Sequence, residues 1–172
     1  NHIRYEYAAE ADDLDLQGPH EAGRSYGTQR YLRRILYGNT PETLDSAARV
    51  GPTRGGRHYV FEVLFDYGDL PEDPASAYLP RPSTLSDGEP ERLAIATPVR
   101  PDPFSTYRPG FEARTLRVCK RVLMVHHFAE LAAAGKPSAT LVKATEFAYE
   151  TDPITQLSFL ASVTVRGYRW DA

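Results

Sequence analysis

An alternation of apolar and polar side chains over residues 58–68 most constrains what this chain can fold into. The segment reads HYVFEVLFDYG, with an aromatic or β-branched residue at every second position. Successive side chains of a strand point to opposite faces of a sheet, so this pattern predicts a β-strand with one apolar face. Glu62 and Asp66 interrupt the other face. Eleven tyrosines and seven phenylalanines, against one tryptophan, favour sheet throughout the chain.

Comparable patterns predict further strands along the chain. The segment 92–99 is expected to form at most a short strand. The other predicted strands are 2–10, 30–39, 114–128, 139–150 and 156–170. The segment 114–128 is interpreted as one long strand, or as two strands joined by a bulge. We therefore predict an all-β fold, mainly an antiparallel meander of six or seven long strands. At most one or two short helices are expected, at 40–49 and 128–135.

The strand at 30–39 is predicted to have two partly covered faces and to end in a turn at Gly38 and Asn39. Its expected faces are Tyr31, Ile35 and Tyr37 on one side, and Leu32 and Leu36 on the other.

The chain is interpreted as one β-rich segment spanning 1–172, with long loops at 11–28 and 69–103. Because it begins at Asn1, inside a predicted strand, we expect it to be a piece excised from a longer protein. With 20 Lys and Arg against 23 Asp and Glu, no electrostatic attraction to nucleic acid or to an anionic membrane is expected. No apolar run approaches the roughly 20 residues that span a bilayer. A single cysteine excludes an internal disulfide and a multi-cysteine zinc site.

Residues 102–112, DPFSTYRPGFE, form the most distinctive loop of the chain. Asp102 before a proline favours a turn, and Gly110 permits a backbone angle that other residues resist. Three aromatic residues are placed to pin this loop to the sheet: Phe104, Tyr107 and Phe111. We expect a structural plug that sets the start of the strand at 114.

Several reactive side chains follow this loop, and each has a structural interpretation. His126 and His127 are adjacent in a strand, so their rings point to opposite faces and do not chelate one ion. Cys119 has no base at a supportive spacing and is expected to be a small buried hydrophobe. The basic residues of this stretch are expected to form cross-strand ion pairs with Glu62, Asp66 or Glu112. These basic residues are Arg114, Arg117, Lys120 and Arg121.

Charged and apolar residues mix on both predicted faces of the 114–128 strand. Such mixing suits a sheet with water on one side and a large cavity on the other, rather than a sandwich with a purely apolar inner face. The glycines at 51–57 lack the Lys and Ser or Thr of a phosphate-binding loop. No catalytic, cofactor-binding or metal-ligating residue is therefore assigned.

Several segments together resemble one family. The segments 3–10, 31–39, 59–69, 100–128, 141–150 and 159–169 occur in an order and at spacings that resemble the N-terminal region of Tc insecticidal toxin B components and of SpvB virulence proteins. The resemblance implies part of an Rhs-like β-sheet shell or scaffold that encloses or carries a toxin effector. It also implies a secreted bacterial toxin whose partners are the rest of its own chain, a C-component cargo shell and an A-component channel.

The same resemblance raises the question of ADP-ribosyltransferase chemistry, because SpvB-like proteins carry such a domain at their C-terminus. The segment 89–91 reads Glu-Pro-Glu, and Ser83 and Thr84 lie upstream, but a proline-rich loop does not suit an ordered catalytic strand. We expect no enzymatic activity and no cofactor. The rival interpretation is a free-standing β-sheet module that binds glycan or protein through exposed tyrosines and Trp170. Self-association through an exposed sheet edge is also expected to be possible.

Overall fold

The computed structural model describes residues 2–11, 14, 16, 19–40, 51–73, 91–130 and 139–169. The strands within these residues are β1 (Arg4–Ala9), β2 (Arg30–Thr40), β3 (Thr53–Arg54), β4 (Arg57–Asp66), β5 (Glu91–Arg92), β6 (Phe104–Thr106), β7 (Ala113–Thr115), β8 (Arg121–His127), β9 (Ala139–Thr151) and β10 (Ser158–Gly167). The predicted all-β fold class is confirmed. Within the described ranges, no helix has the length and apolar character needed to cross a membrane.

The two predicted helices fall mostly outside the described residues. Of the segment 40–49, only Thr40 is described, and it belongs to β2. Of the segment 128–135, residues 128–130 are described, and Ala129 and Glu130 have helical geometry.

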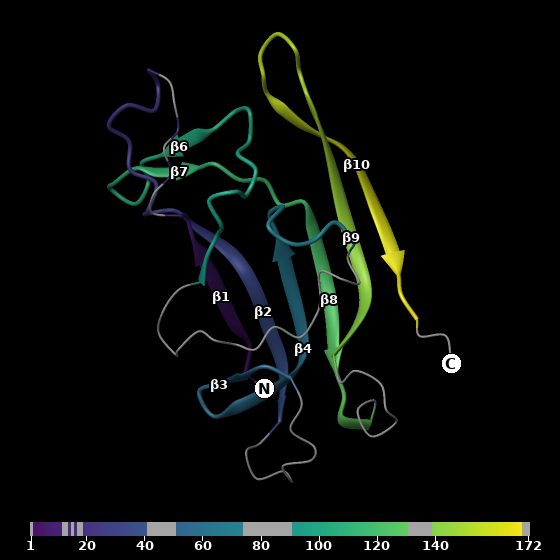
Figure 1. Cartoon of the computed structure of the whole chain (residues 1–172). Coiled ribbons are helices and arrows are strands. Elements are labelled where there is room, and N and C mark those ends of the chain that lie inside the picture. The colour runs from purple at the N-terminus through teal and green to yellow at the C-terminus, as the bar shows by residue number, and fades with distance from the viewer. Residues whose placement is uncertain are drawn as a thin grey trace.

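Six long strands stand side by side in the order of the chain: β1, β2, β4, β8, β9 and β10 (Figure 1). Each pairs antiparallel with the next, which is the predicted meander. The short β3 pairs with β4, and β5 joins the outer edge of β1 in parallel. Strands β6 and β7 form a separate two-stranded sheet beside one end of the large sheet (Figure 1). Strand β10 is the last strand at the opposite edge.

One face of the large sheet, here called the covered face, contains the hydrophobic core and most of the buried charges. Paired residues on neighbouring strands share a face, so the register assigns side chains to it. The pairs between β4 and β8 on this face are Glu62 with Val125, Leu64 with Leu123, and Asp66 with Arg121. All six residues are buried. Leu70, which follows β4, packs into the same apolar cluster.

The opposite face, here called the open face, presents mainly apolar side chains. One row runs across four strands through Tyr5, Ile35, Val63 and Met124. None of these four side chains is buried. In β8, the charged residues Arg121 and His127 lie on the covered face beside Leu123 and Val125, so the mixing predicted for both faces is found there.

A β-bulge in β2 changes the faces predicted for residues 30–39. Glu6 pairs with Arg34 and Tyr7 pairs with Leu32, so Arg33 is an extra residue in β2. The insertion reverses the alternation, which places Tyr31 and Ile35 on opposite faces. Leu32 and Leu36 are also separated, because Leu32 pairs with Tyr7 and Leu36 with Arg4. The predicted face assignment is wrong because a period-two pattern cannot account for an inserted residue.

Gly38 lies inside β2 rather than in a turn at its end. Asn39 and Thr40 continue the pairing with β4. Gly38 has a φ of 67°, and a Cβ atom there would lie 2.5 Å from Cδ2 of Phe61. The glycine is required because the strand takes a left-handed backbone angle where the Phe61 ring packs against it.

The segment 114–128 forms two strands that belong to different sheets. β7 pairs with β6, β8 pairs with β4 and β9, and residues 116–120 lie in neither strand. Backbone groups of residues 116–120 form hydrogen bonds with other segments instead of a neighbouring strand. The Leu116 N–H donates to the Tyr31 hydroxyl over 3.0 Å, and the Lys120 N–H donates to the Asp66 carbonyl over 2.7 Å. The strand breaks because distant segments satisfy its backbone groups.

The Gly38→Ala variant tests the requirement for glycine in β2. A non-glycine residue in the left-handed region costs about 1–3 kcal/mol. The added Cβ must also displace the Phe61 ring, so the free energy of unfolding should fall by at least about 1 kcal/mol. The control is Gly167→Ala in β10, where a Cβ meets no atom within 4 Å. That control should change stability by less than about 0.5 kcal/mol. Urea denaturation measures both, and equal effects would refute the packing argument.

Candidate functional site: a buried ionic layer

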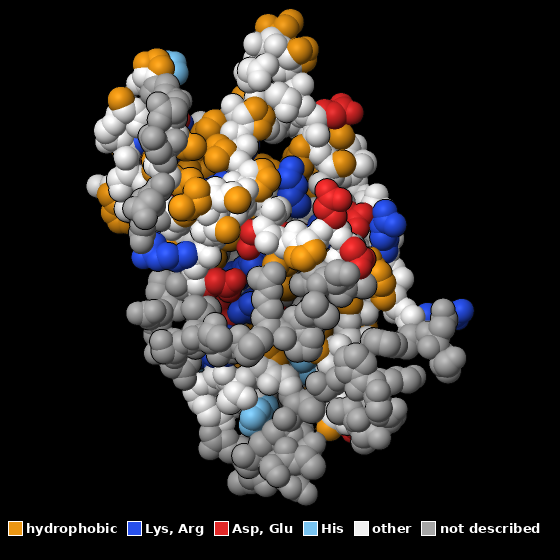
Figure 2. Space-filling model, viewed as in Figure 1, with side chains coloured by type: hydrophobic (Ala, Val, Ile, Leu, Met, Phe, Trp, Pro, Cys, Tyr) orange, Lys and Arg blue, Asp and Glu red, His pale blue; other side chains and the backbone are white. Residues whose placement is uncertain are grey.

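The covered face carries several ion-paired side chains, here together called the ionic layer. Its members are Arg33, Arg34, Glu62, Asp66, Asp69, Glu91 and Arg121. Figure 2 shows acidic and basic side chains together in the middle of the face that it views. A charge removed from water is tolerated only when it is paired and hydrogen-bonded, so the partners of each member determine what the layer does.

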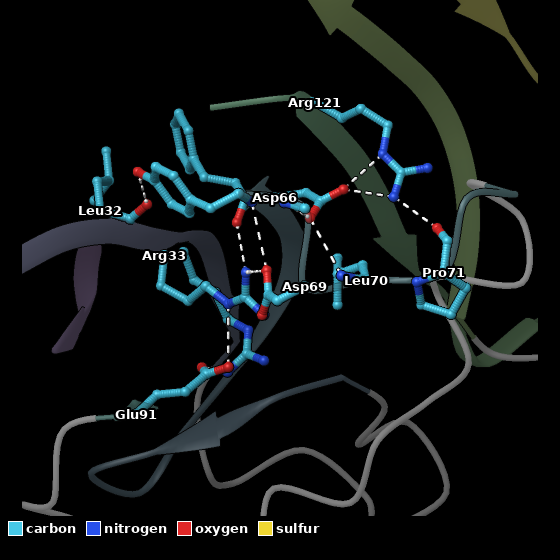
Figure 3. Close-up of polar contacts among 12 residues, drawn as sticks. Leu32, Arg33, Asp66, Asp69, Leu70, Pro71, Glu91 and Arg121 are labelled. Atoms are coloured by element: carbon cyan, nitrogen blue, oxygen red, sulfur yellow. Dashed lines mark hydrogen bonds and ion pairs between the residues drawn. The ribbon is translucent and has the colours of Figure 1, made fainter. Parts of the chain in front are cut away.

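Asp66 and Arg121 form an ion pair of their own within the layer (Figure 3). They are direct cross-strand partners on β4 and β8, and Asp66 is fully buried. Arg121 Nε donates to Asp66 Oδ2 over 2.6 Å, and an Nη nitrogen of Arg121 donates to the Pro71 carbonyl over 2.6 Å. Asp66 Oδ1 accepts the N–H of Gly68 over 2.8 Å. This pair was predicted among the cross-strand ion pairs, and it also fixes the chain that leaves β4.

Arg33, the bulge residue, binds two segments at once (Figure 3). Its guanidinium makes a two-pronged contact with Asp69, at 3.0 and 2.7 Å, and donates to the Phe65 carbonyl at 2.8 Å. Its Nε donates to Glu91 at 3.1 Å. The side chain is only 1% exposed. Sequence reasoning missed this residue, because only the bulge directs Arg33 to the covered face.

Glu91 is the described carboxylate of the Glu-Pro-Glu segment. It accepts Arg33 at 3.1 Å and Arg34 at 3.3 Å, and Arg34 also contacts Glu62 at 3.0 Å. Residues 74–90, which include Ser83, Thr84 and Glu89, lie outside the described residues. Two guanidiniums therefore engage Glu91 as a structural counter-ion.

Arg117 forms a further buried ion pair near the β6–β7 sheet. It contacts Glu10 over 2.6 Å, and both side chains are fully buried. The Tyr31 hydroxyl donates to Glu10 over 3.1 Å. Burial, with the negative charge of Glu10 as a further cause, raises the pKa of Tyr31. The partner expected for Arg117 was a carboxylate on a neighbouring strand; the actual partner comes from the loop after β1.

The loop at 102–112 is held by polar contacts rather than by its aromatic rings. Phe104, Tyr107 and Phe111 are each at least half exposed. Arg114 pairs with Glu21, and Ser105 donates to Glu112 over 2.6 Å. Residues 104–106 and 113–115 pair with each other in a separate hairpin, and the Arg100 guanidinium lies 4.9 Å from the centroid of the Phe104 ring. The predicted pinning by the rings is therefore replaced by charge pairing.

Asp102 links this loop to the start of β10. Its carboxylate accepts Arg100 at 2.8 and 2.9 Å, and it accepts the Ser158 N–H at 2.9 Å and the Ser158 hydroxyl at 2.7 Å. The hydrogen bond from Arg100, the largest cause, and those from Ser158 hold the pKa of Asp102 well below its usual range. Gly110, at φ 88°, turns the chain between β6 and β7.

The remaining predicted residues have separate surroundings. His127 contacts Glu62 at 3.0 Å, whereas the neighbouring His126 ring lies edge-on to Phe61 at 4.9 Å between centroids. The two rings thus lie on opposite faces, as predicted.

Burial raises the pKa of the Cys119 thiol to about 11, which keeps it protonated and unreactive at neutral pH. Among the described residues, no group of three or more His, Cys, Asp or Glu side chains is placed to hold a metal ion. Trp170 lies outside the described residues.

Comparison with known sequences identifies related proteins. A family model described as Salmonella virulence plasmid 65kDa B protein (SpvB) matches residues 1–128. Proteins called mono(ADP-ribosyl)transferase SpvB, from Salmonella typhimurium and Salmonella dublin, are 37% identical over 96% of this chain. The chain spans 26% of those proteins, which is about a quarter of their length.

Two solved structures share the fold. The N-terminal domain of the effector protein SpvB from Salmonella typhimurium strain LT2 aligns with a TM-score of 0.66 and 32% identity, over 97% of this chain and 47% of that domain. The crystal structure of TcdB2–TccC3 without its hypervariable C-terminal region aligns with a TM-score of 0.54 and 30% identity, over 86% of this chain and 6% of that one.

Asp66→Asn tests the Asp66–Arg121 pair of the ionic layer. The change keeps the shape of the side chain but leaves the Arg121 guanidinium buried without its counter-charge, which should lower the free energy of unfolding by about 3 kcal/mol. The control is Glu146→Gln, which breaks the exposed pair with Arg166. That change should cost less than about 1 kcal/mol. Both values come from urea denaturation, and a loss at Asp66 no larger than the control would contradict a stabilising layer.

Asp102→Asn tests the link between the loop and β10 through its pH dependence. The pKa of Asp102 is lower in the folded than in the unfolded protein, so the carboxylate stabilises the fold above its unfolded value of about 4. This stabilisation is lost as the pH falls from about 4 towards the folded pKa. Urea denaturation from pH 7 to pH 3 should therefore show a difference between wild type and variant that shrinks in acid. Ser158→Ala, which leaves Arg100 in place, should keep most of the dependence. A difference that is constant with pH would overturn the link.

Proposed function

The chain belongs to the SpvB family, and we propose that it is a non-catalytic structural segment of a bacterial toxin protein of the SpvB and Tc type. Its sheet contributes to the shell or scaffold that encloses or carries a toxin effector. The observation that most supports this function is the ionic layer, in which Asp66, Asp69 and Glu91 are bound by guanidiniums. These carboxylates fasten the covering segments to the sheet.

Two further observations support a role without catalysis. The relatives named as mono(ADP-ribosyl)transferases are about four times longer, so their named activity does not have to reside in the quarter that this chain spans. Within the described residues, Glu91 and Cys119 are the candidates for chemistry that the sequence raises. Arg33 and Arg34 bind Glu91, and the raised pKa of Cys119 keeps its thiol protonated.

The partners and the location follow from the same relationship. The likeness to TcdB2–TccC3 supports association with toxin-complex subunits, which would be a C-component cargo shell and an A-component channel in a Tc-type assembly. The relatives are a virulence effector and toxin components, which supports secretion or delivery out of the producing bacterium.

The function is tested by separating delivery from catalysis in the parent toxin. Deleting residues 1–172, or introducing Asp66→Asn, should abolish toxicity to intact target cells while the effector activity measured in lysate is unchanged. Glu146→Gln, which breaks an exposed pair, should leave both unchanged. The purified chain should consume no NAD⁺. NAD⁺ turnover by the chain that disappears in Glu91→Gln would overturn the proposal in favour of an enzyme.

A further inference from the structure

The two faces of the large sheet are inverted relative to an ordinary sheet with one wet side. The covered face holds buried arginines and carboxylates, whereas the open face exposes apolar side chains. On the open face, Tyr5 is 55% exposed, Val163 is 51% and Val165 is 58%. A monomeric protein normally places its charges in water and its apolar face against a core, so the open face lacks its cover here.

The apolar side chains of the open face are contiguous. The register joins Val122, Thr145 and Val165 into one row across three strands. A neighbouring row runs through Tyr5, Ile35, Val63 and Met124 and continues to Lys143 and Gly167. Phe147 and Val163 form a further pair. Rows that cross several strands make a broad surface rather than scattered exposed residues.

We propose that the open face is an internal surface, covered in the complete protein by a part of the same polypeptide that lies outside residues 1–172. The length of the solved relative supports this occupant. The structural alignment covers 97% of this chain but only 47% of the Salmonella SpvB N-terminal domain. More than half of that domain therefore lies outside the matched part. The proposal rests on family membership and does not require the scaffold role.

The end of the meander directs the additional chain to this face. β8, β9 and β10 follow one another both in sequence and in the sheet, and consecutive elements usually stay adjacent in space. Every residue of β10 except Ser158 is exposed, and among the described strands only β9 pairs with it, so a continuing chain meets both its outer edge and its open-face side chains. A second copy of the chain has no comparable constraint that would bring it to this surface.

The chemistry of the open face defines what the cover must present. Its inner side must be apolar, to match the valine and aromatic rows, with an acceptor opposite Lys143. Lys143 is exposed and lies between Met124 and Gly167 in its row. An aspartate, glutamate or hydroxyl at that point of the cover would pair with the ammonium group.

Cysteine labelling of the full-length protein tests the cover, in a Cys119→Ser background. Val163→Cys places a thiol on the open face, and the control Thr164→Cys places one on the other side of the same strand. Both positions are exposed in the 172 residues. With a maleimide probe, Val163→Cys should react at least about tenfold more slowly than Thr164→Cys, because access requires local opening. In concentrated guanidinium the two rates should be equal. Equal native rates, or equal protection of both thiols, would overturn the proposal.

A photo-crosslinker identifies the occupant. With p-benzoylphenylalanine in place of Phe147, irradiation of the dilute full-length protein should join this position to a peptide of the same polypeptide outside residues 1–172. A crosslink to residues 1–172 of another molecule that is lost on dilution would assign the face to a second copy. A crosslink that forms only with another toxin subunit would assign it to that partner. Either result overturns the proposal, and both are independent of the toxicity measurements.

Discussion

The buried guanidiniums of Arg33 and Arg121 are the constraint on which the rest of the structure depends. Each is removed from water on the covered face, and a charge in that position is stable only with a carboxylate and several hydrogen bonds around it. The carboxylates are Asp66 within β4, Asp69 just after it, and Glu91 in β5. Neutralising the two arginines therefore holds the chain that leaves β4 and the short β5 against the sheet. The apolar cluster around Leu64 and Leu123 lies beneath the same segments.

The bulge in β2 makes this arrangement possible. Without the inserted residue, Arg33 would alternate to the open face, and Asp69 would have no cation opposite it. The insertion also reverses the face of every residue of β2 before it, which brings Tyr31 to the covered side and its hydroxyl to Glu10. One extra residue thus sets the positions of two ion pairs, the Arg33 pair at the sheet and the Arg117 pair beside β7.

The sequence predicts the parts of the fold that depend on local periodicity. Alternation over 58–68 identifies β4, the same pattern finds the other long strands, and adjacency in a strand places His126 and His127 on opposite faces. It does not predict the bulge at Arg33, the break at 116–120 or the in-strand Gly38, because each depends on a residue from another segment. The partner of Arg121 could be predicted because Asp66 lies on the neighbouring strand. The partner of Arg117 could not, because Glu10 is 107 residues away in sequence.

The segregation of charge and apolar surface explains why the sequence suggested two mixed faces. Charged and apolar residues are both frequent in 114–128, but the structure ends one strand at Thr115 and begins another at Arg121. In β8, the covered side takes Arg121, Leu123 and His127, while the open side takes Val122 and Met124. In a sheet with water on both sides, charged side chains would lie in the solvent, and valines would not form its exposed surface. The large sheet therefore has the composition of a layer enclosed from both sides: by its own loops on one face, and by additional polypeptide on the other.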